Sequence, residues 1–155
     1  MAGAVKDMQT FLSRKGYDSI PMQQNAVGLL LITAKVNGIE GLFILDTGAG
    51  ASVIDPNHAS HLLLVLQNEN TGFTGAGAGG RGLEVTLSIG NIIEIGKHII
   101  KDFTLAVMSL EHANQALTEA GADEALLGII GVDILKPGKA IIDYGTMTLY
   151  LLTDE

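Results

Sequence analysis

The stretch that decides the fold is Phe43-Ile44-Leu45-Asp46-Thr47-Gly48-Ala49. Its apolar part predicts a strand that ends inside the core, which places the Asp46 carboxylate at a tight turn. An acid at a partly buried turn needs hydrogen bonds or a charged partner, and functional carboxylates concentrate at such positions. Gly48 permits close backbone approach, and Thr47 supplies a small hydroxyl side chain. Asp46 is therefore a candidate catalytic residue, and the alternative is a structural aspartate that stabilises the turn.

The segments on either side of this stretch indicate short strands. Apolar and β-branched residues recur in residues 27–36, 42–45, 83–108, 129–135, 140–143 and 147–152. Asn37-Gly38 is a strong signal for a two-residue hairpin turn, and Gly90 and Gly96 are expected at turns or bulges. Many short strands separated by turn residues favour a closed, mostly antiparallel β domain.

Three segments carry helix signals. Residues 7–15 form an amphipathic pattern with Asp7 as a possible N-cap and Gly16 beyond its end. Asp55-Pro56 has the order of a helix start, and a short helix is expected to continue through His61. Residues 109–120 form the third segment, with Ser109 as its cap and Gly121 at its end. We expect an N-terminal helix and lead-in over residues 1–26, followed by one domain over residues 27–155.

The composition excludes several classes of protein. The chain has 155 residues, 47% of them hydrophobic, which suits one domain with a substantial core. A formal charge of −8 opposes nucleic-acid binding, which depends on clustered Lys and Arg. No apolar run reaches the roughly 18 residues that a membrane span needs. Because cysteine is absent, a disulfide framework and a thiol nucleophile are excluded.

The expected compartment follows from the first residues. Residues 1–5 lack the charged and then apolar pattern of a secretory signal. The default expectation is cytoplasmic, and a periplasmic or membrane-tethered location is expected if an upstream segment was removed.

A second motif, together with the first, points to a family. The first motif continues with Ser52-Val53-Ile54, and the second is Gly128-Ile129-Ile130-Gly131-Val132-Asp133-Ile134-Leu135. The pair resembles the retropepsin-like aspartic proteases, the single-domain relatives of the pepsins that include the retroviral enzymes and many bacterial proteins. In that family the first motif has Ser or Thr followed by two aliphatic residues, and the second has two aliphatic residues and a glycine that lead into a short helix. The resemblance covers approximately residues 27–152.

The resemblance implies a retropepsin fold, a closed and barrel-like β structure with two or three short helices, and an aspartic endopeptidase activity. Two aspartates share one proton in that mechanism, and one of them activates a water. The chain has one Asp-Thr-Gly, since Asp143-Tyr144-Gly145 lacks the small hydroxyl residue. We therefore expect a homodimer in which each subunit contributes Asp46, with a peptide or protein as substrate and no metal or other cofactor. A dimer that binds peptides or partner proteins without cleaving them is the alternative.

The resemblance also implies roles for neighbouring residues. Thr47, Gly48 and Ala49 are expected to support the dyad, and Gly131 is expected to pack under the active-site turn. Ile129 and Ile130 are expected to line the substrate cleft. Pepsin-type sites often have a hydroxyl residue in place of Ala49, so we expect a mildly rather than strongly acidic optimum.

A glycine-rich run supplies the expected flap. Gly75, Ala76, Gly77, Ala78, Gly79 and Gly80 are expected to form the tip of a mobile hairpin that closes over bound peptide. A surface hairpin without a role is one alternative. The run also satisfies the dinucleotide-binding fingerprint, with Asp102 as the ribose-binding acid. That fingerprint needs a following helix, whereas residues 83–89 alternate like a strand.

Two further acids have alternative interpretations. Asp55, His58 and His61 have the spacing of a metal site, although such residues on a short helix are more often solvated. In the retroviral relatives an arginine at the place of Val132 pairs with an acid just after the catalytic turn, and both are missing here. Asp133 is then expected to cap the short helix that begins near Ile134.

Overall fold

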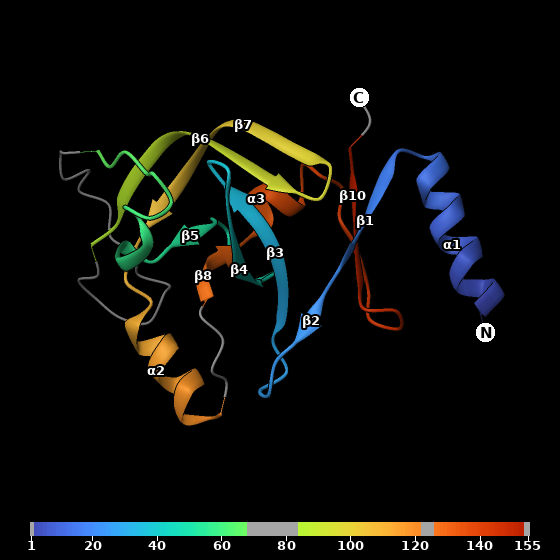
Figure 1. The fold of residues 1–155 in the computed structure, drawn as a ribbon, viewed down its shortest axis with the longest axis horizontal. Coiled ribbons are helices and arrows are strands. Elements are labelled where there is room, and N and C mark those ends of the chain that lie inside the picture. The colour runs from blue at the N-terminus through green and yellow to red at the C-terminus, as the bar shows by residue number, and fades with distance from the viewer. Residues whose placement is uncertain (1, 68–83, 122–125, 154–155) are drawn as a thin grey trace.

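Strands predominate in the computed structural model, which describes residues 2–67, 84–121 and 126–153 (Figure 1). The elements, in chain order, are α1 (Ala2–Arg14), β1 (Tyr17–Pro21), β2 (Gln23–Gln24), β3 (Leu30–Val36), β4 (Ile39–Leu45), β5 (Val53–Ile54), the 3-10 turn η1 (Pro56–His58), β6 (Thr86–Ile95), β7 (His98–Val107), α2 (Glu111–Glu119), β8 (Leu126–Ile130), α3 (Val132–Leu135), β9 (Ile141–Asp143) and β10 (Thr148–Leu152). The expectation of a mostly β chain is confirmed. None of the described helices combines the length and the apolar content of a membrane crossing.

The larger sheet closes on itself. Its strands follow the order β2-β3-β4-β8-β5-β7-β6, and β6 also pairs with β3 through Lys35↔Glu94 and Val36↔Ile93. Closure removes the exposed edges that an open sheet would present. The barrel surrounds a core whose fully buried side chains include Phe43, Ile93 and Ile130. The closed β fold expected from the sequence is therefore confirmed.

The β3–β4 hairpin delivers the chain to Asp46. Asn37 and Gly38 have φ values of 53° and 85°, the left-handed conformation that a two-residue hairpin turn requires. The Asn37 side chain also joins this turn to its surroundings, because Nδ2 donates to the Leu62 carbonyl (2.9 Å) and Oδ1 accepts from the Ile92 amide (3.0 Å). The predicted hairpin is confirmed, and its turn is fastened to strand β6.

The long β6–β7 hairpin contains both predicted glycine positions. Gly90, with φ 77°, lies where the pairing register shifts between Ser88 and Asn91, and Gly96, with φ 57°, lies in the hairpin turn. Glycine adopts this conformation without the penalty that a Cβ would add. Gly90 is therefore a bulge and Gly96 a turn, as predicted.

The two ends of the chain meet in a second sheet. Its order is β1-β10-β9, and β1 pairs antiparallel with β10 from Tyr17↔Leu152 to Pro21↔Thr148. The lead-in before residue 27 thus contributes a strand that the sequence pattern did not predict. Helix α1 lies beside β1 at one end of the molecule, on the far side of this sheet from the barrel (Figure 1).

The helix boundaries differ from those predicted. Helix α1 begins at Ala2, so Asp7 lies inside it and is not its cap, whereas Gly16 (φ 93°) follows its end as predicted. Asp55 caps only the single turn η1, so the helix expected to continue through His61 ends at His58, and residues 59–63 form turns. The predicted cap of α2 is wrong, because Leu110 is the N-cap residue and no side chain caps the helix. The Ser109 hydroxyl, one residue earlier, accepts from the Glu111 amide (3.2 Å).

Candidate active site

Asp46 lies directly beyond the end of β4, at a turn that its own carboxylate helps to close. The Gly48 amide donates to Asp46 Oδ1 (2.8 Å), and the Ala49 amide donates to the Asp46 carbonyl (3.2 Å). The Asp46 amide in turn donates to the Ile130 carbonyl (3.0 Å), which ties the turn to β8. The Asp46 side chain is half-buried, and Thr47 and Gly48 are exposed. The carboxylate is thus held in one orientation while part of it faces outward.

Gly131 packs beneath this turn, as the family resemblance implies. A Cβ at this position would lie 2.6 Å from the Ala49 carbonyl oxygen and 3.1 Å from that of Ala51. Real Cβ atoms do not approach backbone oxygens at 2.6 Å, so a side chain here would displace the turn. The Val132 amide donates to the Ala49 carbonyl (2.8 Å) and holds the two segments at this separation.

Ser52 and Asp133 join the two motifs through hydrogen bonds that the sequence interpretation missed. The Ser52 amide and hydroxyl donate to the two carboxylate oxygens of Asp133, at 2.8 and 2.7 Å. The Ser52 oxygen accepts from the Gly131 amide (2.9 Å), and Ser52 is 0% exposed. The predicted cap role of Asp133 is wrong, because α3 begins at Val132 and Asp133 lies in its first turn facing Ser52. The sequence signal for this contact was a polar residue inside each apolar motif, Ser52 in the first and Asp133 in the second.

An apolar row lies on the face of the sheet that carries Asp46. Ile44 pairs with Ile129, Ile129 with Val53, and Val53 with Ala106, so four neighbouring strands contribute to one row. Directly paired residues share a face, and strand alternation gives Ile44 and Asp46 the same face. Ile44, Ile129 and Ala106 are only half-buried. Val53 is buried in a second apolar cluster with Val85, Met108 and Leu110, and Ile129 and Ala106 pack against it.

Ile129 and Ile130, which the sequence interpretation grouped together, point to opposite faces. Ile129 belongs to the row beside Asp46, whereas Ile130 is 1% exposed and lies in the main core. The reason is the two-residue period of a strand, which sends adjacent side chains in opposite directions. Ile129 is half-buried and packs against a second apolar cluster, and the predicted cleft role of Ile129 stays a prediction.

The expected flap and the dinucleotide alternative depend on residues 75–80, which lie outside the described residues. The described chain resumes at Glu84 and continues as β6, so the helix required by the dinucleotide fingerprint does not occur there. Asp102, the acid assigned to ribose binding in that alternative, lies within strand β7. The described part of the chain therefore gives the dinucleotide alternative no support.

Asp55 has a structural role. It is 2% exposed, and its carboxylate accepts from the Asn57 amide and the Leu110 amide, both at 2.9 Å. His58 is half-buried and His61 is exposed. Within the described ranges, no group of three or more potential ligands lies close enough to hold a metal ion. Asp55 instead joins the end of β5 to the start of α2.

Asp143, the acid of Asp143-Tyr144-Gly145, shapes the turn between β9 and β10. Its Oδ1 accepts from the Gly145 amide (2.8 Å), and its Oδ2 accepts from the Thr146 hydroxyl (2.9 Å). Burial raises the pKa of the Tyr150 phenol above its ordinary value, and the Asp143 carboxylate raises it further. The carboxylate therefore acts within the terminal sheet.

Comparison with known proteins identifies the family. A family model described as aspartyl protease matches residues 32–134, a range that contains the first motif and the second up to Ile134. The chain belongs to the aspartyl protease family. A comparison with curated protein sequences found no match.

Solved structures with the same fold include proteases of bacterial, protozoan and viral origin. A retropepsin-like aspartic protease from Rickettsia conorii is 20% identical, with a TM-score of 0.54 over 87% of this chain and 89% of its own. The retroviral protease-like domain of Ddi1 from Leishmania major is 20% identical, with a TM-score of 0.51 over 79% and 87%. The EIAV protease, in complex with the inhibitor HBY-793, is 21% identical, with a TM-score of 0.55 over 78% and 98%. These similarities show that this aspartyl protease family member has the retropepsin fold.

Proposed function

We propose that the chain is one subunit of a homodimeric aspartic endopeptidase, with a dyad formed by Asp46 of each subunit. The observation that carries the proposal is the half-buried Asp46 carboxylate, oriented by the Gly48 amide (2.8 Å) at the point where both family motifs meet. The chain has one Asp-Thr-Gly, and Asp143 is engaged in a turn of the terminal sheet. A second carboxylate must therefore come from a second copy of the chain.

The proposed chemistry is hydrolysis of a peptide bond by a water held between the two carboxylates. Two carboxylates at that distance do not both ionise without a large penalty, so they share one proton. The ionised Asp46 takes a proton from the water as the water oxygen attacks the peptide carbonyl carbon. The protonated partner donates its proton to the carbonyl oxygen. In the collapse of the tetrahedral intermediate, Asp46 gives the proton it took from water to the amide nitrogen and the partner carboxylate takes a proton back from a hydroxyl of the intermediate. The C–N bond then breaks and releases the amine and the carboxylic acid.

The surrounding residues support this assignment in different ways. Gly48 and Ala49 close the turn, Gly131 allows the second motif to pack beneath it, and Thr47 extends from the turn toward the surface. Ile129 is proposed to contact an apolar substrate side chain. The flap role of residues 75–80 and the mildly acidic optimum stay predictions.

The proposal is tested with Asp46→Asn, which keeps the shape of the side chain and removes the acid. The purified chain is incubated with unfolded protein substrates from acidic to neutral pH, with and without the transition-state mimic pepstatin. The expected result is cleavage that pepstatin inhibits and that Asp46→Asn abolishes. Asp102→Asn is the matched control, because Asp102 is an exposed aspartate on β7 whose left-handed backbone asparagine also adopts. Equal cleavage by Asp46→Asn and the unmodified chain would refute the proposal, and peptide binding without cleavage would favour a silent binding dimer.

A further inference from the structure

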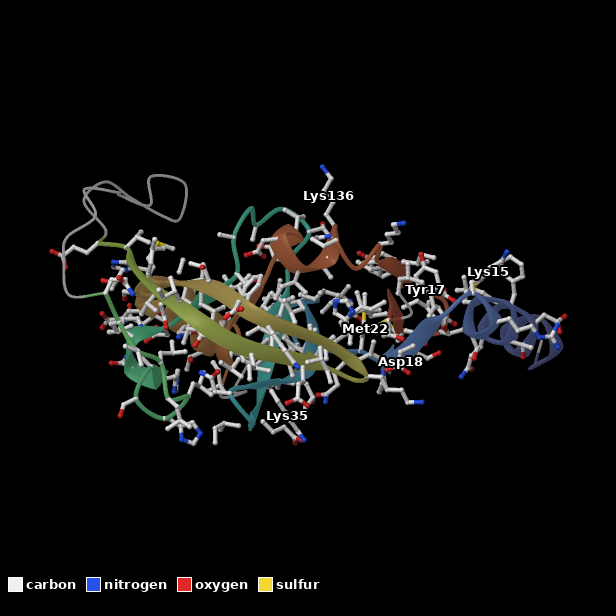
Figure 2. All side chains as sticks on the ribbon, turned by 90° about the horizontal axis from the view of Figure 1, so that it is seen from above. Lys15, Tyr17, Asp18, Met22, Lys35 and Lys136 are labelled. Carbon is white, nitrogen blue, oxygen red and sulfur yellow. The ribbon has the colours of Figure 1, made fainter. Side chains whose placement is uncertain are left out.

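A depression lies where the terminal sheet meets the barrel. Its volume is about 350 Å³, which is within the range of sites that bind small ligands. Ser19 and Pro21 of β1 line it together with Lys35 of β3. Figure 2 shows Lys35 on one side of the molecule and Lys136 on the opposite side. Because Lys136 and Thr47 line a different groove, the depression is separate from the candidate catalytic turn.

Strand β1 presents an unpaired backbone edge to this depression. The Met22 amide donates to the Met147 carbonyl (2.9 Å), which continues the register of β1 and β10. Backbone groups alternate in direction along an antiparallel pair, so those of Ile20 also point toward β10 and those of Ser19 and Pro21 point away. In the described part of the chain β1 pairs with β10 alone, so the outward backbone groups have no strand partner. This edge can therefore accept one more strand.

Helix α1 leaves this part of the edge open. Figure 1 shows α1 close to the start of β1, and the two elements diverge toward β2. The residues that line the depression include Ser19 and Pro21 but none from α1. Pro21 is exposed, and a proline, which has no amide to donate, is found in sheets mostly at such edges.

The charged side chains beside this edge favour a positively charged partner. Lys35 is directly opposite Glu40 on β4 and Glu94 on β6, so the three side chains share the outer face of the barrel. All three line the depression, where two carboxylates stand against one ammonium group. The chain as a whole has a formal charge of −8. A segment that contains Lys or Arg is therefore attracted to this surface, and an acidic segment is repelled.

We propose that the depression binds an extended, positively charged peptide segment, which adds to β1 as an edge strand. The segment pairs with the amide and carbonyl of Ser19, and its basic side chains lie beside Glu40 and Glu94. In added strands the backbone hydrogen bonds supply affinity, and alternate side chains supply selectivity. Binding at this site does not depend on the proposed protease activity, because the segment leaves the Asp46 turn free.

Ser19→Pro tests the backbone pairing. It removes an amide that faces away from β10, so the ladder between β1 and β10 is kept. Ser19→Ala is the matched control, because it retains the amide. The probe is a fluorescent peptide of alternating Lys and Thr, titrated by anisotropy against chains that also carry Asp46→Asn, so that the peptide stays intact. We expect Ser19→Pro to raise the dissociation constant about tenfold and Ser19→Ala to leave it unchanged.

Paired glutamate substitutions test the charge selectivity. Glu40→Gln combined with Glu94→Gln is expected to raise the dissociation constant about tenfold at low salt. The control combines Glu111→Gln with Glu119→Gln, two exposed positions on α2, which changes the net charge equally and is expected to have no effect. A peptide of alternating Glu and Thr is expected to bind the unsubstituted site about tenfold more weakly or not at all. Circular dichroism establishes which variants fold, and the glutamate pairs decide if Ser19→Pro does not.

Each outcome supports or overturns the site. Equal binding by Ser19→Pro and Ser19→Ala overturns the pairing at β1, and an equal loss for both glutamate pairs shows that only overall charge attracts the peptide. No measurable binding of the Lys and Thr peptide overturns the site, as does self-association of the chain that Ser19→Pro abolishes. Peptide binding by a chain without cleavage activity supports the site and counts against the proposed function. Cleavage without peptide binding does the reverse.

Discussion

Replacement of Ser52 by alanine is expected to weaken the support of the active-site turn. The Ser52 hydroxyl donates to Asp133 Oδ1 (2.7 Å) and accepts from the Gly131 amide (2.9 Å). Ser52→Ala leaves the Gly131 amide and one Asp133 oxygen without these partners. Because Ser52 and Gly131 are buried, water does not readily replace the lost hydroxyl. A buried polar group without a partner costs about 1–3 kcal/mol.

The expected loss in free energy of unfolding is therefore about 2–4 kcal/mol, summed over one orphaned amide and one weakened carboxylate contact. This is a large part of the roughly 5–15 kcal/mol that stabilises a typical domain. Asp133 keeps its bond to the Ser52 amide (2.8 Å), so the chain is still expected to fold. Since the turn that orients Asp46 rests on this contact, kcat/KM is expected to fall about tenfold or more.

Urea denaturation measures the first effect and steady-state cleavage of a peptide measures the second. Both are made at one protein concentration, because dissociation of a dimer would otherwise change the apparent stability. Ser52→Thr keeps the hydroxyl and is expected to restore most of the loss, and Ser60→Ala, at an exposed position, is the control. In combination with Asp133→Asn, Ser52→Ala is expected to cost less than the sum of the single changes, because both remove the same bond.

A change in unfolding free energy below about 0.5 kcal/mol, the range of ordinary surface substitutions, would refute this reasoning. Additive effects of the Ser52 and Asp133 substitutions would refute the claim that the two residues act through one contact.

Two further predictions concern the catalytic turn and the terminal sheet. Gly131→Ala forces a Cβ against the Ala49 carbonyl and is expected to reduce kcat on the order of 100-fold. Gly50→Ala is the control, because its Cβ meets no atom within 4 Å and activity should be retained. Equal kcat values for the two variants would contradict this expectation. The pKa of Tyr150 is raised in the folded chain, so its contribution to stability is present below the unfolded pKa, near 10, and is lost as pH rises through the folded value. In thermal melts above the unfolded pKa, Tyr150→Phe should therefore lose less stability per pH unit than the unmodified chain. An unchanged slope of stability against pH would show that Tyr150 is not the group responsible.

Local turn chemistry explains which parts of the fold were predictable. The Asn37-Gly38 hairpin and the glycines at positions 90 and 96 were predicted because left-handed backbone is a property of one or two residues. Alternation in β3 exposes Thr33 and Lys35 between buried neighbours, a pattern that is equally local. The same alternation separates Ile129 from Ile130, and their assignment to one cleft wall failed because the family resemblance was applied without it.

The helix ends were less predictable than the turns. Asp7 has the chemistry of a cap, but the helix begins at Ala2, and Ala2, Ala4 and Lys6 are favourable helix formers. Asp55 does cap a turn, yet its second oxygen is bound by the Leu110 amide, which is distant in sequence. A cap signal in the sequence shows that a side chain can accept an amide bond, and does not show how far the helix extends.

The sequence by itself determined the carboxylate and the turn at Asp46, because these depend on residues close together along the chain. Its pattern of short strands indicated a closed β fold, which pairs distant in sequence such as Lys35↔Glu94 complete. Only the tertiary structure decided that Ser52 meets Asp133, 81 residues away, and that β1 pairs with β10. A side chain such as Asp133 is chemically suited to several partners, and the packing of the barrel selects one of them. The support of the Asp46 turn and the pairing of β1 with β10 are therefore properties of the folded chain.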